Sequence, residues 1–175
     1  MIVGNGDYRY RVNADWARLP DGWSFKEVGG VGVDSHDNVY VFNRGDHPML
    51  VFDRDGYFLR SWGEDQYPRA HGVLVTPDDT MFLTDDGGHF VRKVTLDGKV
   101  LLELGVPGKP APYMSGEPFH RCTHTALSPQ GGDLRIGRVW QLAGPQVHAR
   151  REALAVVGRA RHRRRRIQHR AQHLL

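Results

Sequence analysis

The sequence predicts an all-β fold, an incomplete β-propeller followed by a basic tail that is irregular or partly helical. One observation is a gapless repeat at an offset of 42 residues, with glycines aligned at both ends and in the middle of each copy. A second is that each copy contains four short runs of strand-forming residues separated by polar turns. Regular turns alone would also fit a sandwich, but a repeat of about forty residues is typical of propeller blades.

The two copies predict two complete blades, at about residues 30–63 and 72–105. In the first copy, the runs Val39–Phe42 and Met49–Phe52 are rich in β-branched and aromatic residues, which favour strands. An Asp-Gly pair then precedes a further strand in each copy, and its glycine suits the positive φ of a hairpin turn. We therefore expect blades of four antiparallel strands.

Parts of further blades flank these copies. A third copy begins at His124, after a Gly- and Pro-rich insertion at residues 105–117. Before the first copy, Tyr8–Arg11 and Trp23–Lys26 could supply strands of a preceding or shared blade. We place the partial propeller at residues 1–133 and the tail at residues 134–175. Because propellers need roughly 4–8 blades to close, we expect exposed blade edges to cause self-association.

The two parts differ in charge. The 175-residue chain has a formal net charge of +4, but residues 1–133 hold 13 basic and 19 acidic residues, whereas residues 134–175 hold 11 and 1. No apolar run approaches the ~20 residues of a membrane span, and the start lacks a basic segment followed by an apolar one, so we expect a cytoplasmic protein without a membrane partner. The single cysteine, Cys122, excludes an internal disulfide framework.

The Arg- and His-rich tail has two interpretations. Clustered arginines could bind nucleic acid, but runs of charge are commonly only solvated, so we regard this as the weaker interpretation. We favour a frameshift near residues 131–134, which would place the tail out of frame. Read one base later, the tail can spell PDGKLLLSWG, which matches DRDGYFLRSWG and LDGKVLLELG in the two copies. A frameshift also explains why Asp and Lys are absent from residues 134–175.

Four strings carry a family resemblance: VYVFNRGDHPMLVFDRDG, HGVLVTPDD, FLTDDGGH and FHRCTHTALSPQG. They are similar to bacterial NHL-repeat six-bladed propellers related to peptidyl-α-hydroxyglycine α-amidating lyase, also called peptidylamidoglycolate lyase. The similarity covers about residues 16–134, and its most specific elements are NRGDH and the following AHGV. The chain therefore resembles a truncated member of this group.

The resemblance implies a parent carbon–nitrogen lyase that releases glyoxylate from a peptidyl-α-hydroxyglycine-type substrate. Such a lyase holds zinc through histidines of separate blades, and the zinc acts as a Lewis acid. By resemblance, His71 is the first zinc ligand and Arg44 the catalytic arginine, while the backbone oxygens of Val31 and Val73 bind calcium. The other site residues match only the shifted frame or lie beyond this chain. We therefore expect it to bind neither metal tightly and to be inactive.

Simpler roles remain open for these residues. Arg44 could be a turn arginine paired with a neighbouring carboxylate, and His71 could cap a loop before a glycine. The lyase interpretation requires a small peptide or amide substrate. The alternative is a non-catalytic propeller that binds a ligand or a protein at a channel lined by these two residues.

Two further clusters contain potential metal ligands. The segment His120–His124 holds two histidines and a cysteine, but the preceding Pro118 and insertion favour a loop. The segment Asp85–Gly88 holds two adjacent carboxylates without the spaced acidic series of a calcium-binding loop. We expect a solvated turn there.

Overall fold

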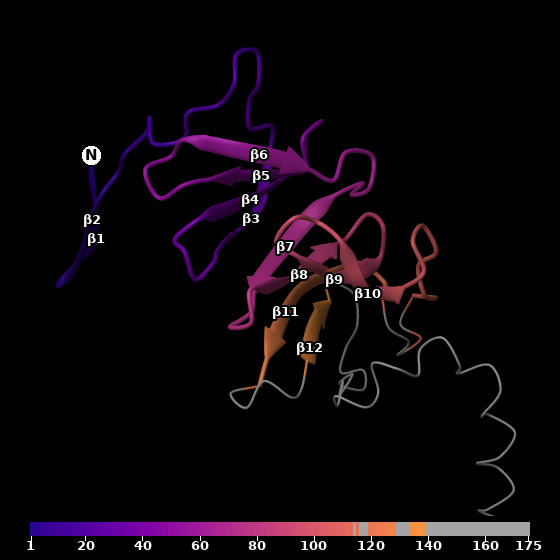
Figure 1. Cartoon of the computed structure of the whole chain (residues 1–175). Helices are drawn as coiled ribbons and strands as arrows, with labels where there is room; N and C mark the ends of the chain where they lie inside the picture. The colour runs from indigo at the N-terminus through magenta and orange to yellow at the C-terminus, as the bar shows by residue number, and fades with distance from the viewer. Residues whose placement is uncertain (114, 116–118, 129–133, 139–175) are drawn as a thin grey trace, which may run out of the picture.

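Every regular element of the computed structural model is a β-strand over the residues that it describes, which are 1–113, 115, 119–128 and 134–138 (Figure 1). The strands are β1 (Ile2–Asn5), β2 (Tyr8–Arg11), β3 (Val28–Val33), β4 (Val39–Asn43), β5 (Met49–Phe52), β6 (Phe58–Trp62), β7 (Ala70–Val75), β8 (Thr80–Asp85), β9 (Phe90–Thr95), β10 (Val100–Gly105), β11 (Cys122–Leu127) and β12 (Leu134–Arg138). Within this described part, no helix could cross a membrane.

Two four-stranded antiparallel sheets form the centre of the molecule. Blade 1 has the order β3-β4-β5-β6, and blade 2 has the order β7-β8-β9-β10, so each is a meander of consecutive strands. The inner strands, Val28–Val33 and Ala70–Val75, correspond at the 42-residue offset of the repeat. The predicted all-β fold with four-stranded propeller blades is therefore confirmed.

A β-bulge interrupts the inner strand of each unit at the same place. In β3 the register shifts between Val28 and Gly30, which leaves Gly29 without a partner in β4. The equivalent shifts leave His71 unpartnered in β7 and Thr123 unpartnered in β11. A bulge lets pairing continue past one extra residue. The inner strands of both blades consequently begin before the glycines that bound the sequence repeat.

A two-stranded sheet lies at each end of the stack of blades. Strands β1 and β2 form a hairpin whose residues are all exposed, and β11 and β12 pair beside blade 2 (Figure 1). Strand β12 shows that regular pairing continues past residue 133, where we place the start of the tail. The segment Trp23–Lys26 forms no strand. Of the proposed frameshift region at residues 131–134, Leu134 lies in β12, whereas residues 131–133 lie outside the described residues, as do residues 139–175.

Alternating side chains pack the blades against each other. In β4, Tyr40 and Phe42 are buried in the core between the two blades, whereas Val41 is buried on the opposite face of blade 1. In β8, Leu83 points into the same inter-blade core, and Phe82 packs toward β11 and β12. Strands of both blades are therefore buried on two faces, as expected of stacked propeller blades.

The outer part of blade 1 is covered by the segment that precedes β3. Partly buried side chains of this segment pack on Val41, Leu50 and Phe52: Trp16, Ala17, Leu19, Trp23 and Phe25. The Trp16 indole also donates a hydrogen bond to the Arg54 carbonyl at 3.0 Å. The segment follows the outer strands, because Arg18 forms a parallel bridge with Tyr57 just before β6.

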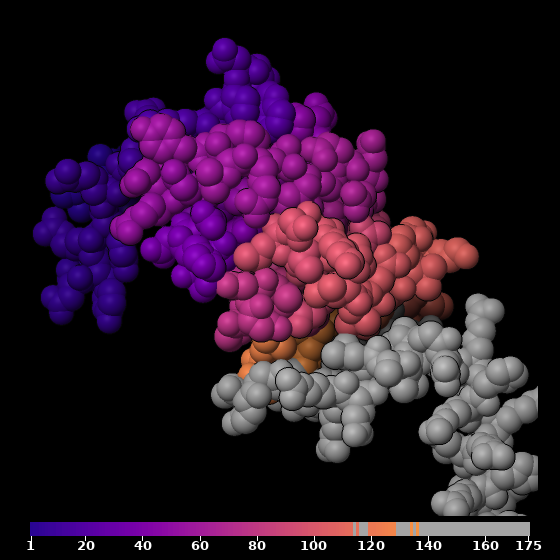
Figure 2. Space-filling model, viewed as in Figure 1, coloured from indigo at the N-terminus to yellow at the C-terminus, as the bar shows by residue number. Residues whose placement is uncertain are grey.

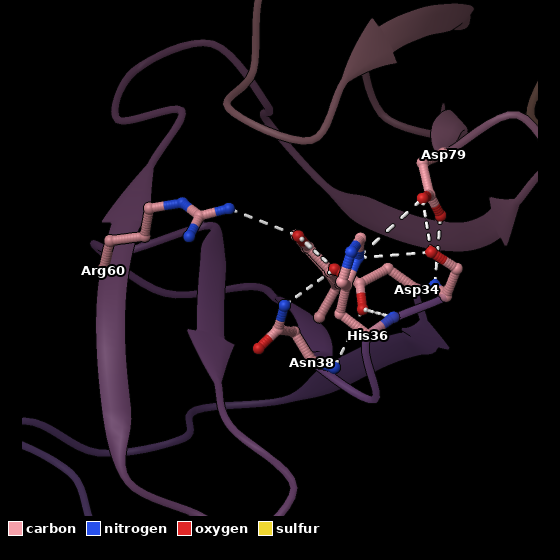
Figure 3. A network of polar contacts seen from close by, with 7 residues as sticks. Asp34, His36, Asn38, Arg60 and Asp79 are labelled. Atoms are coloured by element: carbon pink, nitrogen blue, oxygen red, sulfur yellow. Dashed lines mark hydrogen bonds and ion pairs between the residues drawn. The ribbon is translucent and has the colours of Figure 1, made fainter.

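A buried carboxylate organises the turn between β3 and β4 (Figure 3). Asp34 accepts hydrogen bonds from the backbone N–H groups of His36 and Asn38 at 2.9 Å each, from Asn38 Nδ2 at 2.9 Å and from the Tyr40 hydroxyl at 3.1 Å. Burial acts to raise the pKa of Asp34, but these hydrogen bonds outweigh it and hold the pKa below its ordinary value. Burial and the Asp34 charge raise the pKa of Tyr40 to about 12, so its hydroxyl remains a donor.

The same turn is tied to blade 2. Ser35 donates to the Asp79 carboxylate from its backbone N–H at 3.0 Å and from its hydroxyl at 2.6 Å, and Figure 3 shows this carboxylate reaching across from the neighbouring turn. Arg60 donates to the Tyr40 hydroxyl at 3.2 Å and to the Leu96 carbonyl of blade 2 at 3.3 Å. Polar contacts thus fix one blade relative to the next at this end of the strands.

Candidate functional site

The structure brings Arg44 and His71 together at the junction of the two blades. Arg44 directly follows β4, and His71 is the bulged residue of β7. The Arg44 Nε donates a hydrogen bond of 2.8 Å to the carbonyl of Ala70, the residue before His71. The inner strands approach closely here, because a Cβ on Gly29 would lie 2.4 Å from the same carbonyl oxygen. A glycine in β3 is therefore needed for this arrangement.

Arg44 is already paired with a carboxylate. Its guanidinium lies 2.5 Å from Glu27 Oε1, and its backbone N–H donates to the Glu27 carbonyl at 2.8 Å. The Arg44 side chain is largely buried, whereas Glu27 is exposed. The contact matches the simpler role of a turn arginine beside a carboxylate. Sequence reasoning missed Glu27, because nothing in the local pattern before β3 links it to a residue one strand away.

The imidazole of His71 has an unsatisfied nitrogen. Its Nδ1 is buried and has no hydrogen-bond partner among the described residues. Leaving a buried polar atom unpaired costs about 1–3 kcal/mol, so such an atom suggests a ligand or water at that position. A bulge is also a common device for aiming a side chain at a functional site. The environment of His71 therefore fits the role of one metal ligand.

A complete metal site does not form among the described residues. They contain no group of three or more histidine, cysteine, aspartate or glutamate side chains close enough to hold one ion. A catalytic zinc normally needs three protein ligands. Val31 and Val73, the resemblance-based calcium ligands, occupy equivalent positions in the adjacent inner strands β3 and β7. The described chain thus supplies one position of the three-histidine set that the resemblance implies.

The other two clusters have structural roles. Cys122 is buried, with its sulfur 3.4 Å from the Asp85 carbonyl and 3.3 Å from the Phe90 carbonyl, whereas His124 is exposed. Asp85 is buried and accepts backbone hydrogen bonds, and Asp86 forms an ion pair with Arg69 at 3.1 Å. The Asp85–Gly88 turn is therefore held by internal contacts rather than solvated as we expected.

A surface pocket of about 210 Å³ lies beside the loop that carries Arg44. Trp23 stacks on His47 in this pocket, with ring centroids 3.3 Å apart, and Lys26 and Asp46 supply opposite charges. Its remaining lining residues are Gly22, Ser24 and Gly45. The lining offers hydrogen-bond donors and acceptors beside the stacked rings, in a volume below the roughly 300–1,000 Å³ of typical ligand pockets. Sequence reasoning did not identify Trp23 or His47, because their stacking joins segments on either side of β3 and β4.

Comparison with known sequences identifies NHL repeat-containing proteins and an alpha-amidating monooxygenase as relatives. The chain is 35% identical over 110 residues to human NHL repeat-containing protein 3, covering 57% of this chain and 31% of that protein. It is 43% identical over 89 residues to the mouse protein of the same name, covering 45% and 25%. It is 26% identical over 164 residues to rat peptidylglycine alpha-amidating monooxygenase, covering 75% and 16%. The chain thus spans less than a third of the length of these relatives.

Comparison with solved structures concerns the fold alone. A Bacteroides fragilis protein superposes with a TM-score of 0.50 at 16% sequence identity, covering 73% of this chain and 36% of that one. No protein-family model matches the chain. The sequence relatives and the observed blades agree on a propeller architecture.

Proposed function

We propose, from the premise that this chain is a relative of NHL-repeat β-propeller proteins, that its parent propeller binds a small peptide or amide at the end of the inner strands where Arg44 and His71 meet. The observation that carries the proposal is the buried, unpartnered Nδ1 of His71. The similarity to an alpha-amidating enzyme and the family strings at both residues support the lyase class.

In the complete propeller, His71 would supply one of three zinc-binding nitrogens. A bound zinc would act as a Lewis acid on the hydroxyl oxygen of a peptidyl-α-hydroxyglycine-type substrate. Arg44 donates a hydrogen bond to the carbonyl of Ala70, the residue before His71. The positive charge of Arg44 would orient and stabilise oxygen atoms of the substrate. For that role, substrate must compete with Glu27, which is exposed and therefore able to move aside.

A non-catalytic ligand-binding propeller is the second candidate. It is favoured by the ion pair that neutralises Arg44 and by the polar pocket beside it, which requires no metal. Zinc binding discriminates between the two candidates, because only the lyase class uses His71 as a metal ligand. With one histidine of the set in the described residues, we expect this chain to release no glyoxylate.

Zinc titration followed by NMR of the histidine rings tests the proposal on the full chain. The chain has 10 histidines, so the readout must resolve single residues, and His71→Asn assigns the His71 signal. Zinc binding should be weak, because one ligand of three is present among the described residues, but we expect the His71 ring nitrogens to shift at lower zinc concentration than those of other histidines, since zinc would partner the unsatisfied Nδ1. His36→Asn is the matched control, because the His36 side chain is exposed.

Two results would contradict the proposal. If the His71 signals respond only together with those of exposed histidines, no preferred zinc site exists and the non-catalytic candidate is supported. If the chain releases glyoxylate and His71→Asn retains that activity, His71 is not the zinc ligand that the lyase class requires.

A further inference from the structure

The face of blade 1 that points away from blade 2 is partly exposed to solvent. Val28 and Val31 in β3 are 44% and 55% exposed, whereas the equivalent Ala70 and Val73 in β7 are 0% and 8% exposed. The difference arises because blade 1 covers the inner strand of blade 2, while no described residue covers β3 in the same way. The segment that packs on this side of blade 1 contacts β4, β5 and β6 instead. A partner for the inner part of this face is therefore missing.

The opposite end of the stack also has an inner strand, β11, with exposed residues on its outer face. At the junction of the blades, Gly30 and Gly32 of β3 lie against Val73 and Val75 of β7. The residues of β11 at these two glycine positions, His124 and Ala126, are exposed. A further inner strand could stack on β11 in the same orientation, at a wider separation because these two positions carry side chains. Strand β3 has exposed valines, Val31 and Val33, at the positions that correspond to Val73 and Val75 of β7.

The two-stranded sheets β1–β2 and β11–β12 correspond to different halves of a four-stranded blade. Strands β11 and β12 are the inner pair of a blade, and among the described residues β12 pairs only with β11. The hairpin β1–β2 corresponds to an outer pair, because in sequence it precedes the segment leading to β3, just as β5–β6 precedes the segment leading to β7. Figure 2 shows this hairpin as a separate lobe at the side of blade 1. An isolated hairpin of this size is only marginally stable in water.

We propose that two copies of this chain associate head to tail and complete each other's blades. In each junction, β11–β12 of one copy stacks on β3 of its partner, and the hairpin β1–β2 of the partner pairs with the open edge of β12. Each copy then contributes two complete blades and one half at each end. The dimer would contain six blades, which lies within the roughly 4–8 blades of closed propellers.

Closure explains why a dimer is expected rather than a filament. A head-to-tail contact uses two different surfaces, so it forms a ring when the rotation between copies closes and an open fibre when it does not. With three blades per copy, two copies close the ring, and the open edges of β12 and β1 pair with each other at each junction. Pairing of β1 with β12 is strand addition, in which backbone hydrogen bonds supply the contact.

The test is the mass of the full chain in solution, measured by sedimentation and light scattering over a range of concentrations. We expect twice the chain mass of 19.8 kDa. Val33→Asp places a charge in the proposed junction, and we expect the dissociation constant to rise about 10-fold or more, because an unpaired charge would be buried. Val106→Asp is the matched control: Val106 is 54% exposed, Val33 is 51% exposed, and Val106 lies outside both half-blades.

Hydrogen exchange supplies a second readout that locates the contact. We expect the amides of β12 and β1 to be protected in the wild-type chain and to exchange faster in Val33→Asp, with the amides of β4 and β8 unchanged. A monomer at all concentrations would overturn the proposal and would indicate that another segment of the same chain covers these edges. An assembly that both aspartate variants weaken equally would also overturn it, because the contact would then be non-specific.

Discussion

Asn43 and Asp85 show how one residue position serves both blades. Each ends the second strand of its blade and accepts backbone hydrogen bonds from the segment leading into the first strand. Asn43 Oδ1 accepts from the N–H groups of Lys26 and Glu27 at 3.0 and 3.2 Å, and Asp85 accepts from Arg69 N–H at 2.8 Å. The role therefore requires an acceptor oxygen and no charge.

The charge of Asp85 makes stability depend on pH. Burial raises the pKa of this carboxyl, although backbone hydrogen bonds act in the opposite direction. A raised pKa in the folded state favours the protonated form, so the contribution of Asp85 to stability is largest at low pH and falls as pH rises through the folded-state pKa. Asn43 has no such dependence, because an amide does not titrate.

We expect Asp85→Asn to fold and to gain stability relative to the wild type as pH increases from 4 to 7. Urea unfolding at several pH values measures this difference. Asp85→Ala is the control, because it leaves the Arg69 and Gly88 N–H groups without an acceptor and should cost about 1–3 kcal/mol. A difference between wild type and Asp85→Asn that does not change with pH would contradict the raised pKa.

At the scale of elements, the inner strands of neighbouring blades lie so close together that some of their glycines have no room for a Cβ atom. A Cβ on Gly72 of β7 would lie 2.7 Å from the backbone oxygen of Thr123 in β11. A Cβ on Gly32 of β3 would lie 2.6 Å from a methyl group of Val75, a side-chain atom that can rotate away. Close approach of the strands is therefore limited by backbone atoms at Gly29 and Gly72, and by side-chain atoms at Gly32.

We expect Gly72→Ala to destabilise the chain by about 1–3 kcal/mol, because β11 must move as a whole to accommodate the methyl group. Gly32→Ala introduces the same atom and should cost less, since the atoms it meets are side-chain methyl groups of Val73 and Val75 rather than backbone. Thermal unfolding of the two variants under identical conditions compares them. Equal losses of stability would show that the separation of inner strands is not fixed by the backbone of β11.

The sequence predicts those strands whose residue composition and flanking turns identify them locally. The runs Val39–Phe42 and Met49–Phe52 lie in β4 and β5, because strand composition and turns are local properties. The segment Trp23–Lys26 has a similar composition but packs on the outer strands without pairing. The difference depends on contacts with residues far along the chain, which no periodicity records.

The candidate site was also predictable only where local sequence strings mark its residues. The family strings indicated Arg44 and His71, and the structure places them side by side through the Ala70 carbonyl. Cys122 was predicted in a loop, yet it is the first residue of β11, because the bulge extends each inner strand backwards. The pairing of Arg44 with Glu27 and the stacking of Trp23 on His47 required the folded arrangement.

At the scale of the whole molecule, the largest apolar core lies between the blades rather than inside either one. It combines Tyr40, Phe42, Met49 and Val51 of blade 1 with Ala70, Val73, Met81, Leu83, Phe90 and Val94 of blade 2. Stacked repeats derive stability from each unit and from the interfaces between neighbours. With this core shared, the two blades should unfold together.

We expect Leu83→Ala to lower the stability of both blades by about 2–5 kcal/mol in one cooperative transition, because Leu83 is fully buried between them. Leu101→Ala removes the same atoms from an exposed position of β10 and should change stability by less than about 0.5 kcal/mol. Urea unfolding, followed by tryptophan fluorescence and by circular dichroism, measures both. Two separate transitions in Leu83→Ala would show that the blades are independent folding units.

The recurring bulge has a consequence for how such a molecule changes over generations. The same bulge position occurs in the inner strands β3, β7 and β11, where it is occupied by glycine, histidine and threonine at positions 29, 71 and 123. The occupant makes no ladder pairing, so replacement at positions 71 and 123 leaves the strand pairing of β7 and β11 intact. Position 29 differs, because a Cβ there would lie 2.4 Å from the Ala70 carbonyl oxygen. Substitution of one residue could therefore add or remove an imidazole in blade 2 or at β11, and chemistry at this end of the strands can be gained or lost without a change of fold.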